Sequence, residues 1–172
     1  EYSDGIVRGI DVETNLFELL ALEKSTNLIL GSSFVSRFQK DNNPKFNLPQ
    51  NVGVYGLRSN LISGNFNYYL EYVHKYNDPA GSIADNSNNY ASGNAIKTSL
   101  TYFQKGLGFS FDAHRVDNME FRSERQQSKE YIINYIPTLS KQHSYTLLAF
   151  YPCATQSNGE IGFQSDLYYK FE

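Results

Sequence analysis

The sequence predicts an all-β protein, an antiparallel up-and-down transmembrane β-barrel with about nine strands in a single domain over residues 1–172. Two observations predict this class. Apolar and polar residues alternate with a period of two along most of the chain, which is typical of strands with two different faces. Short turns and long polar loops also alternate between these segments, as they do in outer-membrane barrels.

The clearest strands form a predicted hairpin over residues 94–116. Apolar residues fall on even positions before the Lys105-Gly106 dipeptide and on odd positions after it. A two-residue turn at this dipeptide would place Tyr102 opposite Phe109 on an apolar face, and Lys97 opposite His114 on a polar face. A slip of one residue would mix the two faces, so the pattern strongly specifies the register.

A second hairpin with the same logic is predicted around Ser63-Gly64, pairing Leu61 with Phe66 and Arg58 with Tyr69. The connection Phe17–Ser25 fits either a helical turn or a continued strand. The remaining strands follow from the same alternation. In chain order, strands are expected over Gly5–Leu16, Thr26–Phe38, Asn51–Ile62, Asn65–Tyr76, the hairpin above, Lys129–Pro137, Gln142–Tyr151 and Glu160–Phe171.

The apolar faces are expected to meet lipid. They carry few charges, and Arg8 and Arg115 both fall near the long-loop ends of their strands. A charge costs roughly 2–4 kcal/mol at the middle of a bilayer but close to nothing at its surface, so this placement suits a membrane. Aromatic residues such as Tyr55 and Phe66 also bracket aliphatic ones, as in the two interfacial girdles of a barrel.

The alternative is a soluble β-sandwich or closed β-barrel that binds a ligand, for example a glycan, through exposed tyrosines. It has the same alternation, but its apolar face lies inside. In that case Leu57, Leu70, Leu100 and Phe111 would be buried by protein on all sides. The accessibility of these four side chains therefore distinguishes the two arrangements.

The polar faces carry the residues predicted to matter for function. Charges of both signs occur there, and in a barrel they would line a water-filled lumen and tune its selectivity. The predicted polar faces include Asp11, Glu13, Arg37 and Asp166. The residues singled out as lumen-facing are Arg58, Glu71, Lys97, Asp112 and His114.

Composition and motifs argue against several other classes of protein. The net charge of -3 does not favour a nucleic-acid partner. One cysteine, Cys153, cannot form an internal disulfide or a multi-cysteine metal site. The histidines show no ligand spacing, and Ser110, Asp112 and His114 lie side by side on one strand rather than as a triad. The sequence therefore predicts no enzyme, no catalytic residue, no cofactor and no metal.

The strand count predicts that the chain is part of a larger barrel. Single-chain bacterial barrels have an even number of strands. The odd number found here, beginning with a strand that runs into a short turn, implies that some of the wall is missing.

Four segments carry a resemblance to a known family. They are GSSFVSRFQ (31–39), HRVDNMEFRSER (114–125), PTLSKQHSYTL (137–147) and YPCATQSNGEIGFQSDLYYKF (151–171). Together they resemble an uncharacterised outer-membrane β-barrel family of Bacteroidetes, a domain of unknown function whose members are longer than this chain. The resemblance implies an outer-membrane location and gives no catalytic residues. The expected function is a non-catalytic pore or scaffold subunit, with outer-membrane lipid and other envelope proteins as the classes of partner.

Overall fold

The computed structural model describes residues 5–21, 25–40, 48–78, 91–124, 133, 156 and 159–171. Within these residues the chain forms strands and one short helix. In chain order they are β1 (Ile6–Asn15), α1 (Leu16–Leu19), β2 (Thr26–Phe38), β3 (Asn51–Ser63), β4 (Phe66–Lys75), β5 (Gly93–Gln104), β6 (Leu107–Asp117) and β7 (Gly159–Tyr169).

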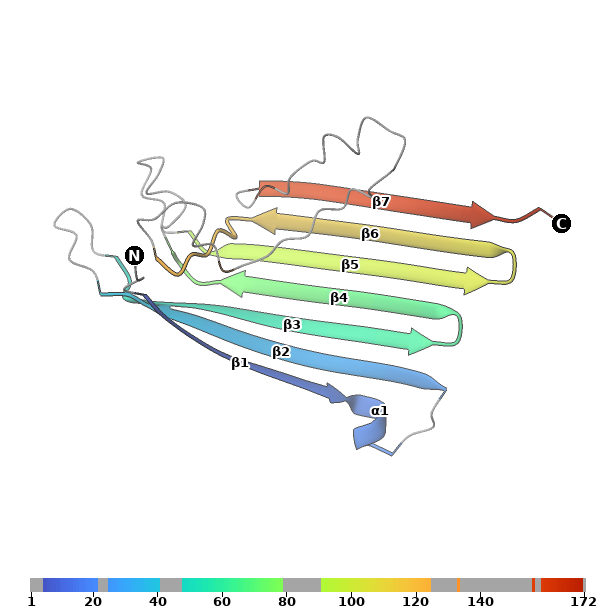
Figure 1. The fold of residues 1–172 in the computed structure, drawn as a ribbon, viewed down its shortest axis with the longest axis horizontal. Helices are drawn as coiled ribbons and strands as arrows, with labels where there is room; N and C mark the ends of the chain where they lie inside the picture. Colours follow the sequence, from blue (N-terminus) through green and yellow to red (C-terminus); the bar gives the residue numbers. More distant parts are fainter. Residues whose placement is uncertain are drawn as a thin grey trace.

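The strands form one antiparallel sheet in the order β1-β2-β3-β4-β5-β6-β7, so each strand pairs with its neighbours in the described chain. Figure 1 shows that the hairpin turns β3–β4 and β5–β6 lie at one end of the sheet, here called the turn end. The chain enters β3, β5 and β7 at the opposite end, here called the loop end. This arrangement confirms the predicted all-β class, and from β1 to β6 it also confirms the alternation of short and long connections.

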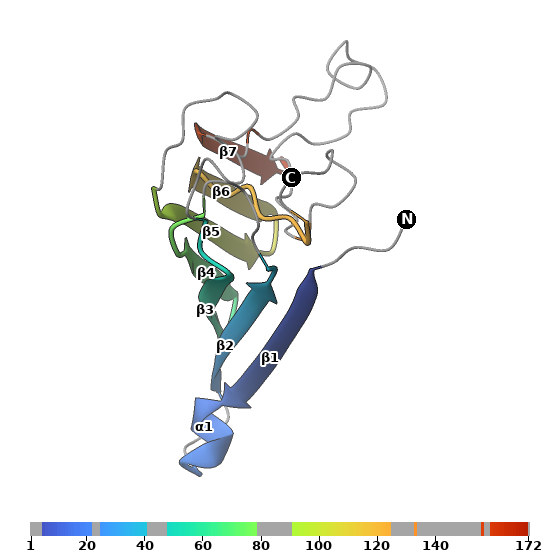
Figure 2. The same cartoon turned by 90° about the vertical axis from the view of Figure 1, so that its left-hand side faces the viewer.

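The seven strands are not closed into a barrel, because β1 and β7 are the two edges of the sheet. The smallest outer-membrane barrels need roughly eight strands, so seven cannot form that closed wall. The predicted strands at Lys129–Pro137 and Gln142–Tyr151 fall, apart from Ile133, outside the described residues. In an up-and-down barrel these two strands would lie between β6 and the expected ninth strand. That part of the predicted order is wrong, because the expected ninth strand is β7 and it pairs directly with β6. Figure 2 shows the strong twist of the sheet from β7 to β1.

The register of the β5–β6 hairpin is confirmed. Tyr102 lies opposite Phe109 and Lys97 lies opposite His114. The turn consists of Lys105 and Gly106, and Gly106 has a φ of 82°. This left-handed conformation is accessible to glycine at little cost, so the glycine fixes both the turn and the pairing that follows from it.

The predicted register of the β3–β4 hairpin is wrong by two residues. The turn is made by Gly64 and Asn65, Ser63 pairs with Phe66, and Arg58 pairs with Glu71 rather than with Tyr69. A hydrogen bond of 2.9 Å between the hydroxyls of Thr26 and Ser63 supports Ser63 as part of the strand. Because the shift is an even number, every side chain keeps its predicted face.

The short connection after β1 begins as a helix rather than a continued strand. The Oδ1 atom of Asn15 accepts a hydrogen bond of 3.2 Å from the backbone N–H of Phe17, which is an N-cap. The helix α1 has four residues. In the described part of the chain, no helix has the length and apolar character needed to cross a membrane.

One face of the sheet is apolar and lacks the burial of a soluble core. Leu57 is 52% exposed, and Leu70, Leu100 and Phe111 are only half-buried. None of these four side chains is therefore enclosed on all sides. The fully buried hydrophobic side chains among the described residues instead gather at the loop end. They are Leu48, Val52, Val116, Met119 and Phe121.

Replacing Gly106 by alanine should destabilise the protein by about 1–2 kcal/mol, because alanine is strained at a left-handed φ. An added Cβ would meet only the backbone oxygen of Lys170, at 3.7 Å, so the effect should come from the backbone alone. Urea unfolding of G106A measures this loss. G159A is the control, since nothing lies within 4 Å of its Cβ and Gly159 lacks a positive φ. Equal urea midpoints for G106A and G159A would contradict a left-handed backbone at Gly106.

Candidate functional site

Four of the five residues predicted to face a lumen lie in one row across the sheet. Arg58 on β3 is opposite Glu71 on β4, Glu71 is opposite Lys97 on β5, and Lys97 is opposite His114 on β6. We call these four residues the charged row. Arg58, Glu71 and Lys97 carry positive, negative and positive charge in turn, so these two neighbouring pairs each bring opposite charges together. Asp112 lies on the same face but outside the row, opposite Ser99.

Arg58 extends the charged row to the edge of the sheet by reaching across β2 to β1. Its Nη1 and Nη2 atoms donate to the two carboxylate oxygens of Asp11, at 2.7 and 2.8 Å. Its Nη2 and Nε atoms donate to Glu13 at 3.0 and 3.2 Å. Ser33 on β2 accepts a further hydrogen bond of 2.8 Å from Nη1. The guanidinium group therefore uses its fork of donors on two carboxylates at once.

Gly31 provides the path for Arg58. This residue of β2 lies opposite both Glu13 and Arg58. A Cβ atom built on Gly31 would be 2.5 Å from the Nε atom of Arg58, closer than real Cβ atoms come to any neighbour. Asp11, Glu13 and Arg58 were predicted on the polar face, but their contact was not predicted. A glycine at polar parity between two strands with opposite charges was the available signal.

The opposite half of the polar face is held by pairs between β6 and β7. The Nε2 atom of His114 lies 2.8 Å from Oε1 of Glu160. Ser110 donates to Asp166 at 3.4 Å. The partners of Ser110 and His114 thus come from β7, so these residues do not form a relay with Asp112. Glu71 is also engaged, since it accepts a hydrogen bond of 2.7 Å from the hydroxyl of Tyr69.

A segment after β6 covers the polar face at the loop end. We call Asn118–Arg122 the loop-end cap. Asn118 has a φ of 47° and donates from Nδ2 to the backbone oxygen of Ala91 at 2.9 Å, which anchors the start of the cap. Met119 and Phe121 are each 3% exposed, so the cap supplies part of the small buried core at this end.

Two cations are buried beneath the loop-end cap. Arg37 forms an ion pair of 3.0 Å with Asp78 and donates to the backbone oxygen of Arg122 at 2.8 Å. Lys75, the last residue of β4, donates to the backbone oxygen of Glu120 at 2.8 Å. Burial lowers the pKa of Lys75 to about 8, and the nearby Asp78 carboxylate opposes this shift. Sequence analysis placed Arg37 on the polar face but did not predict its burial.

The arrangement presents charged side chains of both signs on one face of the sheet. Arg58 and His114 are paired with acids across strands. The acids that Arg58 holds remain in contact with solvent, since the side chains of Asp11 and Glu13 are 58% and 53% exposed. Among the described residues, no group of three or more histidine, cysteine or acidic side chains is placed to hold a metal ion.

The fold and the two faces define an antiparallel meander sheet with one bare apolar face and one face of paired charges. The family model of a family of unknown function, DUF6029, matches residues 1–172, and the chain belongs to that family. No curated protein and no solved structure is similar enough to this chain to match it.

Replacing Gly31 by alanine should push Arg58 out of its position between Asp11 and Glu13. Forcing a long side chain off its preferred rotamer costs about 1 kcal/mol, so G31A should unfold at a lower urea concentration. The matched control is G56A on β3, where the added Cβ would have its nearest neighbour at 3.6 Å, an ordinary contact. If G31A proves as stable as G56A, the bridging role of Arg58 is wrong.

Proposed function

We propose that this chain forms part of the wall of a bacterial outer-membrane β-barrel, with the apolar face toward lipid and the charged row toward an aqueous lumen. The proposed role is non-catalytic, as a pore or as a scaffold subunit of an envelope assembly. Outer-membrane lipid is the expected partner of the apolar face, and other envelope proteins would contact the loops. The observation that carries the proposal is the exposure of large apolar side chains on six of the seven strands, all except β6.

The pattern of exposure supports lipid as the medium for this face. Leu30 is 37% exposed, Leu57 52% and Ile96 43%, and all three lie on strands flanked by neighbours on both sides. Contiguous apolar surface of this extent is unfavourable in water and typical of interaction sites or membrane contact. Lipid tails would cover it without a second protein layer.

The order of side chains along the strands also supports a membrane. Between the ends, the apolar face carries mainly aliphatic residues such as Leu70, Ile96 and Leu100. Aromatic residues gather toward both ends, for example Tyr55 toward the loop end and Tyr102 toward the turn end. Girdles of this kind mark the two interfaces of outer-membrane barrels. The loop-end cap and the cations beneath it lie beyond the aliphatic band.

Further strands would be needed to complete the barrel. The edge strands carry the most exposed apolar side chains: Ile10 on β1 is 65% exposed, and Ile161 and Phe163 on β7 are each 78% exposed. Within the described residues, β1 and β7 each pair with a neighbouring strand on one side alone, and a backbone group that faces hydrocarbon needs a hydrogen-bond partner. We therefore propose that the wall continues beyond β1 and beyond β7.

Adjacent cysteines on β3 should report the two proposed solvents. Both cysteines are introduced in a Cys153→Ser background and tested in native membranes. A water-soluble maleimide should label R58C at least roughly tenfold faster than L57C. The reason is that maleimides react with the thiolate form of cysteine, whereas a thiol in hydrocarbon stays protonated. A lipid-soluble maleimide should reach L57C. Labelling in denaturing detergent, where both positions are open, normalises the rates. Equal labelling in membranes, or purification as a stable monomer from plain buffer, would contradict a lipid-facing position for Leu57.

Single-channel recording should separate a pore from a scaffold. In planar bilayers, a pore lined by the charged row should become more cation-selective in K97E, because the substitution replaces a positive side chain on the lumen face. The control is I96V, the neighbouring position on the apolar face, which should leave the reversal potential unchanged. A membrane-embedded protein that gives no channels would identify the wall as a scaffold.

A further inference from the structure

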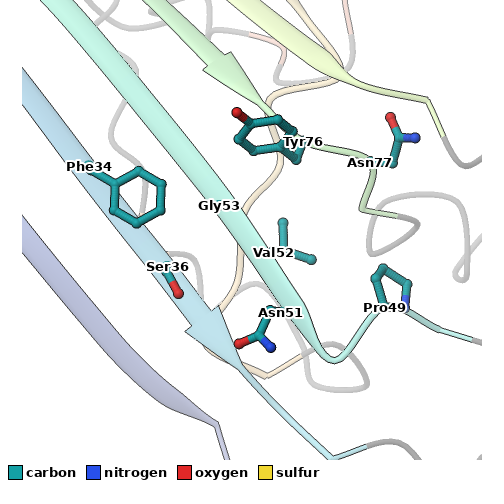
Figure 3. Close-up of a pocket in the computed structure, with 8 residues that line it drawn as sticks. All are labelled: Phe34, Ser36, Pro49, Asn51, Val52, Gly53, Tyr76 and Asn77. Carbon is teal, nitrogen blue, oxygen red and sulfur yellow. The ribbon is translucent and has the colours of Figure 1, made fainter.

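A pocket opens on the apolar face at the loop end, between β2, β3 and the residues that follow β4. Its volume is about 430 Å³, within the range of small-ligand pockets. Figure 3 shows that it is formed by aromatic side chains and uncharged polar side chains together. The residues used below are Phe34, Ser36, Asn51, Gly53, Tyr76 and Asn77.

The pocket depends on the absence of a side chain at Gly53. A Cβ atom there would lie 3.1 Å from the ring of Phe34 and 3.2 Å from the ring of Tyr76. The two rings therefore flank bare backbone, with no side chain between them (Figure 3). Both are open to the outside, since Phe34 is 43% and Tyr76 is 52% exposed.

Tyr76 is held in place by its neighbours. Its backbone N–H donates to the oxygen of Gly53 at 2.9 Å. Its ring lies 6.0 Å from the ring of Tyr55 and 5.5 Å from the ring of His74, in an edge-on contact with the histidine. Such contacts restrict the ring before any ligand arrives, which lowers the cost of binding.

The polar groups of the pocket are uncharged and available. None of the side chains lining the pocket is charged. Ser36, Asn51 and Asn77 contribute a hydroxyl and two amides, and within the described part of the chain these side chains form no hydrogen bond with one another or with other groups. An amide offers two donors and one acceptor, so together these groups can pair with several hydroxyls at once.

This combination fits a ligand that is neutral, has an apolar face and carries hydroxyl groups at its edge. No cation lines the pocket, since Arg8, opposite Ser36, lies over the ring of Phe38 instead. An acyl chain would leave the amides of Asn51 and Asn77 unpaired, which is unfavourable. A hexose ring meets all three requirements, because its C–H face can lie on an aromatic ring while its hydroxyls reach the polar side chains. We propose that this pocket binds a neutral hexose unit of a glycan.

This proposal does not depend on the membrane proposal, because the pocket is bounded by residues of the chain itself. It can therefore fail while the lipid-facing assignment of Leu57 stands, and the reverse is also true. The two are tested by different measurements, cysteine labelling for the membrane and ligand titration for the pocket.

The test is titration of the full chain, in a phosphocholine detergent that contains no sugar, with linear tetrasaccharides of glucose, galactose and mannose. Saturation-transfer NMR and calorimetry should detect binding of at least one of them. G53A should weaken that binding by roughly tenfold or more, a loss well outside titration error. G56A should bind like the wild type, because Gly56 lies on the opposite face of the same strand with room for a Cβ.

A second variant is needed because the two rings could shift in G53A and still bind the sugar. Y76L removes the aromatic surface while keeping an apolar side chain, and it should lose binding to a similar extent. Circular dichroism confirms that each variant keeps its sheet. The proposal is overturned if no neutral tetrasaccharide binds, if both variants bind like the wild type, or if a tetrasaccharide of uronic acids binds at least as tightly.

Discussion

The structure depends on a strict two-residue period kept in register across seven strands. Because successive side chains point to opposite faces, one residue out of phase would carry a charge into the apolar face. The exceptions are few and share a location. Apart from tyrosines, the apolar face of the described strands carries four ionisable side chains. They are Arg8, His74, Arg115 and Asp117, and all of them lie toward the loop end. The two-residue period thus separates an apolar surface from a charged one. The few charged residues on the apolar surface are confined to the loop end.

The two ends of the sheet are built differently. The turn end closes with two-residue hairpins and a short helix, whereas the loop end carries the loop-end cap and a small buried core. Burying Arg37 and Asp78 there is costly unless the two stay paired. Removing one partner of a buried pair costs about 3–5 kcal/mol. The ion pair therefore ties the end of β2 to the residues after β4, and the cap closes over both. In the proposed barrel, this cap would narrow the lumen on the side of the long loops.

The sequence predicted faces more reliably than contacts, for a physical reason. At Lys105-Gly106, the parity of the apolar residues would also allow the two neighbouring turns. One of these lacks a glycine and the other would put Leu107 in the turn, so the predicted register is favoured. At the second hairpin, turns at Ser63-Gly64 and at Gly64-Asn65 keep the same parity, and alternation cannot choose between them. The hydroxyl of Thr26, far away in the chain, supports the observed choice by bonding to Ser63.

The alternation of apolar and polar residues also could not predict which side chains are buried at the loop end. Arg37 was predicted on the polar face and lies there. The alternation of side chains does not show, however, whether a later segment of the chain covers a residue. The loop-end cap does so more than eighty positions along the chain, as the 2.8 Å hydrogen bond from Arg37 to the backbone of Arg122 shows. The predicted strands between this cap and β7 remain predictions, since they lie almost entirely outside the described residues.

Two glycines within strands show how the two faces acquire their specific features. Glycine weakens a strand because it adds conformational freedom and no packing, so its presence needs a compensating gain. At Gly31 the gain is on the polar face, where Arg58 crosses from β3 to the carboxylates of β1. At Gly53 it is on the apolar face, where the rings of Phe34 and Tyr76 lie 3.1 and 3.2 Å from the place that a Cβ would take. At both positions, the parity of the glycine gives the face on which neighbouring side chains use the space of the missing Cβ. Gly56 has no such crossing neighbour, which is why it serves as the control for both.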